Sequence, residues 1–202
     1  MLTTETKVKK YLGLTTLPSP LITADINIYA EAITKYIEDY CGREFETSVA
    51  TSKVYDGQGT KEITIDDLYA LTKIETLDED GDVENTLDDS SEYYLYPENT
   101  TNKNLIKINT SNSPISIFPK GNQNVKVTAS FGYSATVPEI ISLAATKLVA
   151  GIISEQYLSD AGSVKKEKLG HYEIEYQDID KLVNSLGIDK ILDQYRLIGV
   201  WV

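Results

Sequence analysis

Apolar residues recur every three or four positions between residues 24 and 41. This spacing places an apolar stripe along a helix whose opposite side is charged. Thr23 is the expected N-cap, and Gly42 is the expected stop because glycine readily adopts the left-handed conformation that follows a helix. We predict that the helix buries this stripe against other helices, in its own chain or in a neighbour. The stripe consists of Ile26, Tyr29, Ala30, Ile33, Tyr36, Ile37 and Tyr40.

The pattern changes after Phe45, where alternation and turn residues replace helical spacing. About seven short strands are predicted in the region 48–133, at a spacing typical of a small sandwich or barrel. Residues 78–82, Asp-Glu-Asp-Gly-Asp, are predicted to form a hairpin tip. The strand-like stretches are 62–65, 71–77, 83–87, 93–96, 105–108, 115–118 and 125–131, and residues 54–55 lead into a turn at 56–59.

Helical spacing returns at Pro138, a residue that suits the first turn of a helix. Residues 138–157 are apolar around so much of the helix that we expect them to form the buried centre of a helical core. The other predictions are a short helix at 3–12, a basic loop at 165–168, an extended segment at 171–177, and short amphipathic helices at 179–186 and 188–195.

This order of helices, strands and helices predicts an α+β fold. We expect a helical bundle formed by the N- and C-terminal parts, with an inserted small antiparallel β-domain. The helical domain is predicted to comprise residues 1–47 plus 134–202, and the inserted β-domain residues 48–133. Such insertions are tolerated at surface loops whose two ends lie close together.

Composition narrows the class of protein. The 202 residues carry 19 basic and 31 acidic side chains, a net charge of −12, which argues against a protein that grips nucleic acid by its phosphates. The single cysteine excludes an intrachain disulfide. We find no signal peptide and no stretch of about 20 apolar residues that would span a bilayer, so we expect a protein made and folded in a cytoplasm, with no membrane partner.

Candidate chemistry is sparse. The acidic stretch 78–82 lacks the twelfth-position glutamate of an EF-hand and is flanked by strands, so a solvated hairpin tip is preferred over a calcium site. His171 and Cys41 are the only residues of their types, and nothing in their spacing indicates a nucleophilic pair or the four ligands of a zinc site. Cys41 is interpreted as a small packed residue. We therefore predict no catalytic residue, no metal and no cofactor.

Two segments are candidates for contact with partners. The apolar end of the chain either folds back on its own core or docks on another protein. The basic loop and the alternating segment after it either form a solvated connector or add to the edge of a neighbour's sheet. The candidate docking residues are Leu197, Ile198, Val200, Trp201 and Val202, and the candidate assembly residues are Lys165, Lys166, Lys168, Tyr172 and Tyr176.

Three pieces of the sequence, taken in order, resemble the head–tail connector (adaptor, or head completion) proteins of long-tailed bacteriophages and of gene transfer agents. The first is a helix that closes on Tyr-Cys-Gly-Arg-x-Phe at residues 40–45. The second is VTASFGYSATVP at 127–138, and the third is KLGHYEIEY at 168–176. The resemblance covers nearly the whole chain, and the β-insertion makes it similar to longer members of the family.

The resemblance implies a structural virion protein and no enzyme. Family members form a ring, usually a dodecamer, beneath the portal, where they extend the DNA channel and offer a surface to the stopper or tail-completion protein. We therefore expect the partners to be further copies of this chain, the portal, and the stopper or tail-completion protein, with DNA passing through the lumen without sequence recognition. Residues 197–202 are expected to dock on the portal, and residues 165–176 to become ordered on assembly.

Two alternatives remain open from the sequence. The β-domain, in a chain with fourteen tyrosines, is compatible with a sandwich that binds a carbohydrate or a receptor at the end of a helical stalk. A stopper or tail-completion protein of the same neck differs from an adaptor only in its position along the channel.

Overall fold

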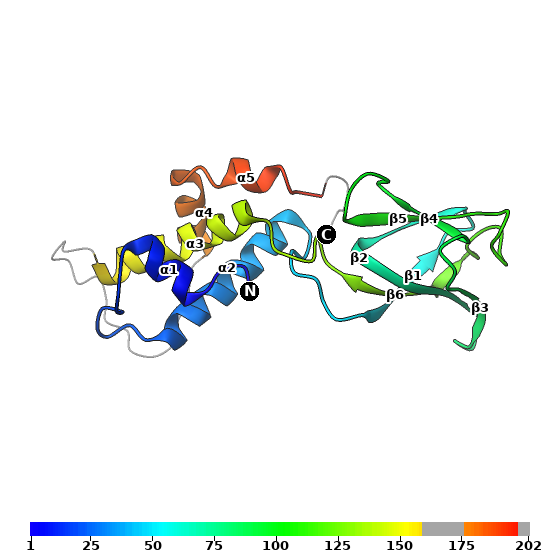
Figure 1. Cartoon of the computed structure of the whole chain (residues 1–202), viewed down its shortest axis with the longest axis horizontal. Helices are drawn as coiled ribbons and strands as arrows, with labels where there is room; N and C mark the ends of the chain where they lie inside the picture. Colours follow the sequence, from blue (N-terminus) through cyan, green and yellow to red (C-terminus); the bar gives the residue numbers. More distant parts are fainter. Residues whose placement is uncertain (159–175, 198–202) are drawn as a thin grey trace. The chain divides into compact units, whose positions relative to one another are not determined.

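The chain has a mixed α and β fold in which two compact units are distinct (Figure 1). The computed structural model describes residues 1–158 and 176–197. The first unit contains Met1–Gly42 and the described residues from Pro138 onward, and the second is Arg43–Val137. Separate folding of the second unit as an inserted domain, with the expected extent 48–133, stays a prediction.

The first unit is helical, and its central element is α3. Helix α3 packs against four other helices, α1, α2, α4 and α5, and it is buried along most of its length, as its all-round apolar pattern predicted. A single π-helical turn continues it, so the apolar stretch ends close to the expected residue 157. The elements are α1 (Glu5–Leu12), α2 (Thr23–Cys41), α3 (Glu139–Ile153), the π-turn η1 (Ser154–Leu158), α4 (Tyr176–Ser185) and α5 (Asp189–Asp193).

The ends of α2 follow local capping chemistry, with one departure from expectation. Gly42 adopts φ 65° and its N–H donates to the carbonyls of the last turn, as predicted. The N-cap is Ile22, however, and Thr23 is the first helical residue, so the predicted Thr23 cap was wrong by one position. The Asp25 carboxylate takes over the capping role by accepting the Ile22 N–H at 3.0 Å.

The N-terminal segment and α4 contact α3 at small or polar residues of α3. Thr3 Oγ1 lies 2.7 Å from Thr146 Oγ1 of α3 in a fully buried contact, and Lys7 Nζ donates to Ser142 Oγ at 2.7 Å. At the other end of α3, a Cβ on Gly151 would lie 2.9 Å from Leu182 Cδ2 of α4. Gly151 therefore allows α4 to approach α3 closely.

The second unit is a six-stranded antiparallel sheet. The strand order is β1-β6-β2-β5-β4, and β3 pairs with β2 beside this path. One cluster of buried apolar side chains forms its core, which includes Phe118 and Phe131. The strands are β1 (Thr51–Gly57), β2 (Glu62–Leu77), β3 (Val83–Leu87), β4 (Tyr93–Tyr96), β5 (Lys103–Ile108) and β6 (Gly121–Phe131).

Two strand predictions were wrong. The stretches 62–65 and 71–77 are one long strand, β2, because its first half pairs with β5 and its second half with β3 and β6. Residues 115–118 form no strand, although Phe118 is buried and its N–H donates to Thr60 O at 2.8 Å. Pro114 and Pro119 flank this stretch and interrupt a hydrogen-bonded ladder.

The hairpin tip at 78–82 is confirmed between β2 and β3. The Asp78 carboxylate accepts the backbone N–H groups of Asp80 and Asp82 at 3.0 and 2.9 Å, and Gly81 has φ 86°. The acidic residues of this stretch thus include one that organises the turn itself.

Candidate functional site

The first residue of the candidate docking segment 197–202 is hydrogen-bonded to the last residue of α2. The Leu197 N–H donates to Cys41 O at 2.9 Å. Leu197 Cβ also lies close to Gly42, at 3.9 Å from the position a Cβ would take there. Ile198, Val200, Trp201 and Val202 lie outside the described residues, so the structure fixes the origin of this segment and no more.

The candidate assembly segment lies almost wholly outside the described residues, which exclude Lys165, Lys166, Lys168 and Tyr172, and also His171. Tyr176 is the first residue of α4. The predicted extended segment 171–177 was therefore wrong at its end. The helix predicted at 179–186 from the spacing of Ile179 and Val183 is present as α4, but it begins three residues earlier, at Tyr176. Residues 176 and 177 are therefore helical and not extended.

The C-terminal helices are attached to the last two turns of α2 by polar contacts. Tyr36 Oη donates to Asp180 of α4 at 2.6 Å, and Tyr40 Oη donates to Asp193 of α5 at 2.8 Å. Burial, and then the Asp180 carboxylate, raise the pKa of Tyr36, so the hydroxyl remains a donor. Cys41 is fully buried beside these contacts, which confirms its interpretation as a packed residue. This end of α2 thus holds α4, α5 and Leu197 together.

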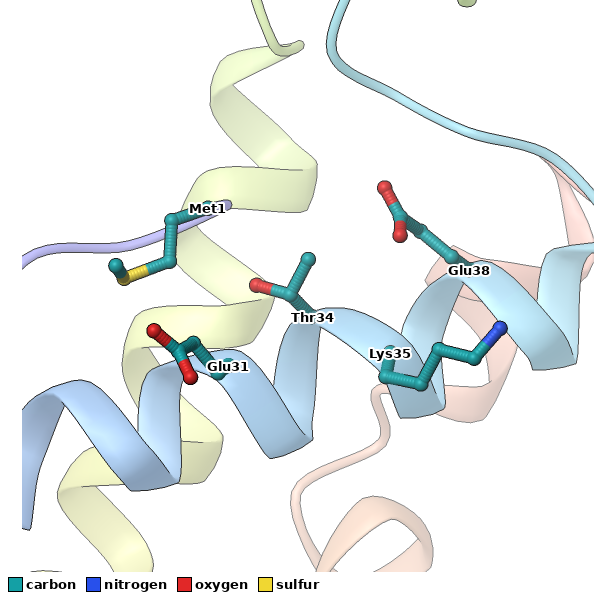
Figure 2. A pocket seen from close by; sticks show the side chains of 5 residues that line it. All are labelled: Met1, Glu31, Thr34, Lys35 and Glu38. Carbon is teal, nitrogen blue, oxygen red and sulfur yellow. The ribbon is translucent and has the colours of Figure 1, made fainter.

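A surface hollow of about 370 Å³ lies beside α2 (Figure 2). Its lining consists of Met1 and four residues from successive turns of one side of α2: Glu31, Thr34, Lys35 and Glu38. None of these five side chains is a histidine, cysteine or serine. Within residues 1–158 and 176–197 there is no group of three histidine, cysteine, aspartate or glutamate side chains arranged to hold a metal ion. The polar groups that the hollow presents are therefore two carboxylates, a lysine ammonium and a threonine hydroxyl.

The sequence did not reveal a polar cluster that lies where the chain enters and leaves the second unit. Arg43 Nη1 lies 3.4 Å from Asp67 Oδ2, and the side chains are 11% and 2% exposed. The Arg43 guanidinium also lies 5.1 Å from the ring centroid of Tyr133, which itself packs 5.8 Å from Phe45. Arg43, Phe45 and Tyr133 were visible in the sequence only as parts of the quoted motifs; Asp67 carried no signal.

Backbone hydrogen bonds close the same cluster, which we call the clasp (residues 43–48, Asp67 and 131–134). Tyr133 N donates to Glu44 O at 2.9 Å, and Ser48 N donates to Phe131 O at 2.8 Å. Gly132 N donates to Asp67 O at 2.8 Å. The segment that enters the second unit and the segment that leaves it are therefore hydrogen-bonded side by side. The leaving segment is also hydrogen-bonded to β2, and the entering segment contacts β2 through the ion pair of Arg43 with Asp67.

The second unit is the more acidic part of the protein. It contains sixteen acidic and eight basic residues, which accounts for −8 of the net charge of −12. Some of this charge is internally balanced: Glu75 is buried between Lys73 Nζ at 2.7 Å and Lys126 Nζ at 3.4 Å. The hydrogen bond from Lys73, and then Lys126, lower the pKa of Glu75 against the opposing effect of burial.

Comparison with known proteins identifies the family. The sequence matches the model of a family described as "HCP: Head completion protein" over residues 1–196. A chain from the solved structure "Neck of empty GTA particle computed with C6 symmetry" has a TM-score of 0.57 and 13% identity, and the match covers 97% of this chain and 90% of that chain. A chain from "Virion of native gene transfer agent (GTA) particle" has a TM-score of 0.47 and 16% identity, with the same coverage. No curated protein matches.

The first structural likeness shows a shared fold along almost the full chain. No helix in the described part of the chain is long and apolar enough to cross a membrane. The resemblance to head completion proteins, expected from three short motifs, is confirmed by the family model. Because that model spans nearly the whole sequence, the protein belongs to the head completion protein family, a family of structural proteins of the virion.

Proposed function

We propose that the protein is a head–tail connector, or adaptor, which assembles as a dodecameric ring beneath the portal. In this position the ring extends the DNA channel and provides the docking surface for the stopper or tail-completion protein. The observation that carries the proposal is the match to the head completion family over residues 1–196, which includes both units. The structural neighbour belongs to the neck of a particle, and we propose the same location for this chain.

The helical unit is the proposed ring-forming part. We infer that its helices form a bundle around α3 whose outer sides contact adjacent copies. Ile140 and Leu143 are exposed one turn apart on α3, and Ile28 is exposed on α2. Covering exposed apolar side chains is favourable, so we propose that these three residues face an adjacent copy in the ring.

The charge of the chain supports a role beside DNA without recognition of it. DNA-binding surfaces need basic residues against the phosphates, and here acidic residues outnumber basic ones in both units. An acidic protein repels DNA, so DNA would pass such a wall without adhering.

Mixing the purified protein with its portal tests this function. We expect a ring with the mass of twelve 22.5 kDa chains on one face of the portal, visible by electron microscopy and weighed by native mass spectrometry. A ring that binds only the tail side of the neck would assign the protein as a stopper. A chain that binds glycans through its second unit and ignores the portal would replace the connector assignment altogether.

We also propose that residues 197–202 dock on the portal. Removal of residues 198–202 retains Leu197 and its hydrogen bond to Cys41, so the helical unit should keep its stability. The expected result is loss of portal binding in a pull-down, with unchanged thermal unfolding. A second variant replaces the same five residues by glycine and serine, which keeps the length and removes the apolar side chains, and it should lose portal binding as well. If either variant binds the portal like the unmodified protein, this segment is not the docking element.

A further inference from the structure

The longest strand of the second unit has an unpaired stretch in the middle of one edge. On one side, β2 pairs with β6 from Leu68 to Thr76. On its other side, β5 pairs with β2 up to Leu68, and β3 pairs with it from Ile74 onward. No strand in the described part of the chain pairs with the residues between. We call this stretch, residues 69–73, the β2 gap.

The β2 gap is open to solvent. Tyr69, Ala70 and Thr72 are exposed, and within residues 1–158 and 176–197 no strand or loop supplies a backbone hydrogen bond to that edge. An unpaired edge of this kind is a template for an added strand. Leu68 and Ile74 are six residue steps apart, but the register with β6 shifts between Leu68 and Ala70 and again between Leu71 and Lys73. These bulges bend β2, so the open edge is shorter than the about 20 Å of a regular strand and accommodates about four residues of a partner.

One end of the β2 gap is acidic. Strand β3 ends at Leu87, which is the register partner of Ile74, and the exposed residues Asp88 and Asp89 follow directly. The unit around them has a net charge of −8. An extended segment with basic residues at its start therefore complements the gap, provided that it runs antiparallel to β2, as every other strand of the sheet does beside its neighbour.

We infer that the β2 gap of one copy receives about four residues from the segment 165–175 of an adjacent copy in the ring, as an added antiparallel strand. Lys165, Lys166 and Lys168 precede a segment in which Tyr172 and Ile174 alternate with polar residues, which is the pattern of a strand. In the antiparallel direction, the lysines lie beside Asp88 and Asp89. This inference rests on the proposed ring assembly.

Length and symmetry are consistent with a second copy as the occupant. The seventeen residues between Leu158 and Tyr176 have an extended length of about 55 Å. Because both ends of this segment are attached to helices of the same unit, its middle extends at most about half of that length from them. A contact between a loop of one copy and a sheet edge of the next joins two different surfaces. Such heterologous contacts generate closed rings when repeated around an axis.

Photocrosslinking in the assembled full-length protein tests the inference. Tyr69, which is 45% exposed, is replaced by p-benzoylphenylalanine, and an equal mixture of nitrogen-14 and nitrogen-15 protein is irradiated. We expect mixed-isotope crosslinks between position 69 and residues 165–175, identified by mass spectrometry. The control is the same replacement at Tyr94 of β4, which is 50% exposed, and its crosslinks to residues 165–175 should stay at background.

The outcomes separate this inference from the proposed function. A ring that forms without crosslinks from position 69 to residues 165–175 overturns the inference and leaves the connector ring intact. Crosslinks only within one copy, or to the portal, also overturn it. If no ring forms, alone or on the portal, both proposals fail.

Charge reversal provides an independent measurement. Changing Lys165, Lys166 and Lys168 to glutamate should weaken self-association by about tenfold or more, because negative side chains then face the carboxylates of Asp88 and Asp89. Adding Asp88→Lys and Asp89→Lys should restore most of the lost affinity. Failure of this second pair to restore it, or wild-type association of the triple variant, would rule out the pairing of the lysines with this end of the gap.

Discussion

Replacing Gly132 by alanine should lower the free energy of unfolding of the second unit by about 3–5 kcal/mol. Gly132 has φ 131°, a conformation that side chains rarely adopt. An added Cβ would lie 2.3 Å from Glu46 O and 2.8 Å from Thr47 Cα. These are backbone atoms of the clasp, so no side-chain rotation relieves the overlap, and the segments that enter and leave the unit must separate.

The loss is best measured by hydrogen exchange of β6 in increasing urea, because this reports the stability of the second unit alone. Gly81→Ala is the matched control. Gly81 also has a positive φ, 86°, but nothing lies within 4 Å of its added Cβ. It should cost only about 1–2 kcal/mol, the strain of the backbone conformation. Equal losses of stability for the two variants would mean that the close approach of Gly132 to Glu46 and Thr47 does not contribute to the free energy of unfolding.

The second large effect is expected for Asp67→Asn, with a loss of about 3 kcal/mol. Asparagine keeps the size and the contact with Asn102 but removes the charge opposite Arg43. Arg43 Nε is buried and has no hydrogen-bond acceptor among the described residues, so its compensation comes from the Asp67 charge and from the face of Tyr133. The variant leaves a buried cation without its counter-charge.

Asp66→Asn is the control, since it is the same change at the preceding residue. Asp66 is 57% exposed and pairs with Lys53 at the surface, so its replacement should cost no more than about 1 kcal/mol. The double variant Arg43→Met with Asp67→Leu should recover much of the stability lost by Asp67→Asn, because it removes both buried charges. Chemical denaturation checks all three, and a similar loss at positions 66 and 67 would contradict the assignment of a buried ion pair.

Elements specified by local pattern were predictable. The helix at residues 24–41 appears as α2, with Gly42 in the expected left-handed conformation, because 3.6-residue periodicity and a glycine stop are local properties of the chain. The hairpin between β2 and β3 was also predictable, since an Asp-Gly turn between two strands is a short-range signal.

Strand partners were not predictable to the same degree. The segments 62–65 and 71–77 looked like separate strands, whereas β2 runs through both and changes its partner halfway. Residues 115–118 have strand-like composition but lie between two prolines in a loop that places Phe118 in the core. In both cases the outcome depends on which distant segment supplies hydrogen bonds, and that information is absent from a window of ten residues.

The sequence by itself determined the order of helices and strands, the acidic charge and, through three short motifs, the family. Only the tertiary structure decided which of two adjacent aspartates carries structural weight: Asp66 is exposed, while Asp67 is buried opposite Arg43, 24 positions earlier in the chain. It also decided that Arg43 and Tyr133 meet, and that no strand among residues 1–158 and 176–197 pairs with the middle of β2 on one edge. Burial and pairing are set by contacts between segments far apart in sequence, whereas periodicity and capping act within a few residues.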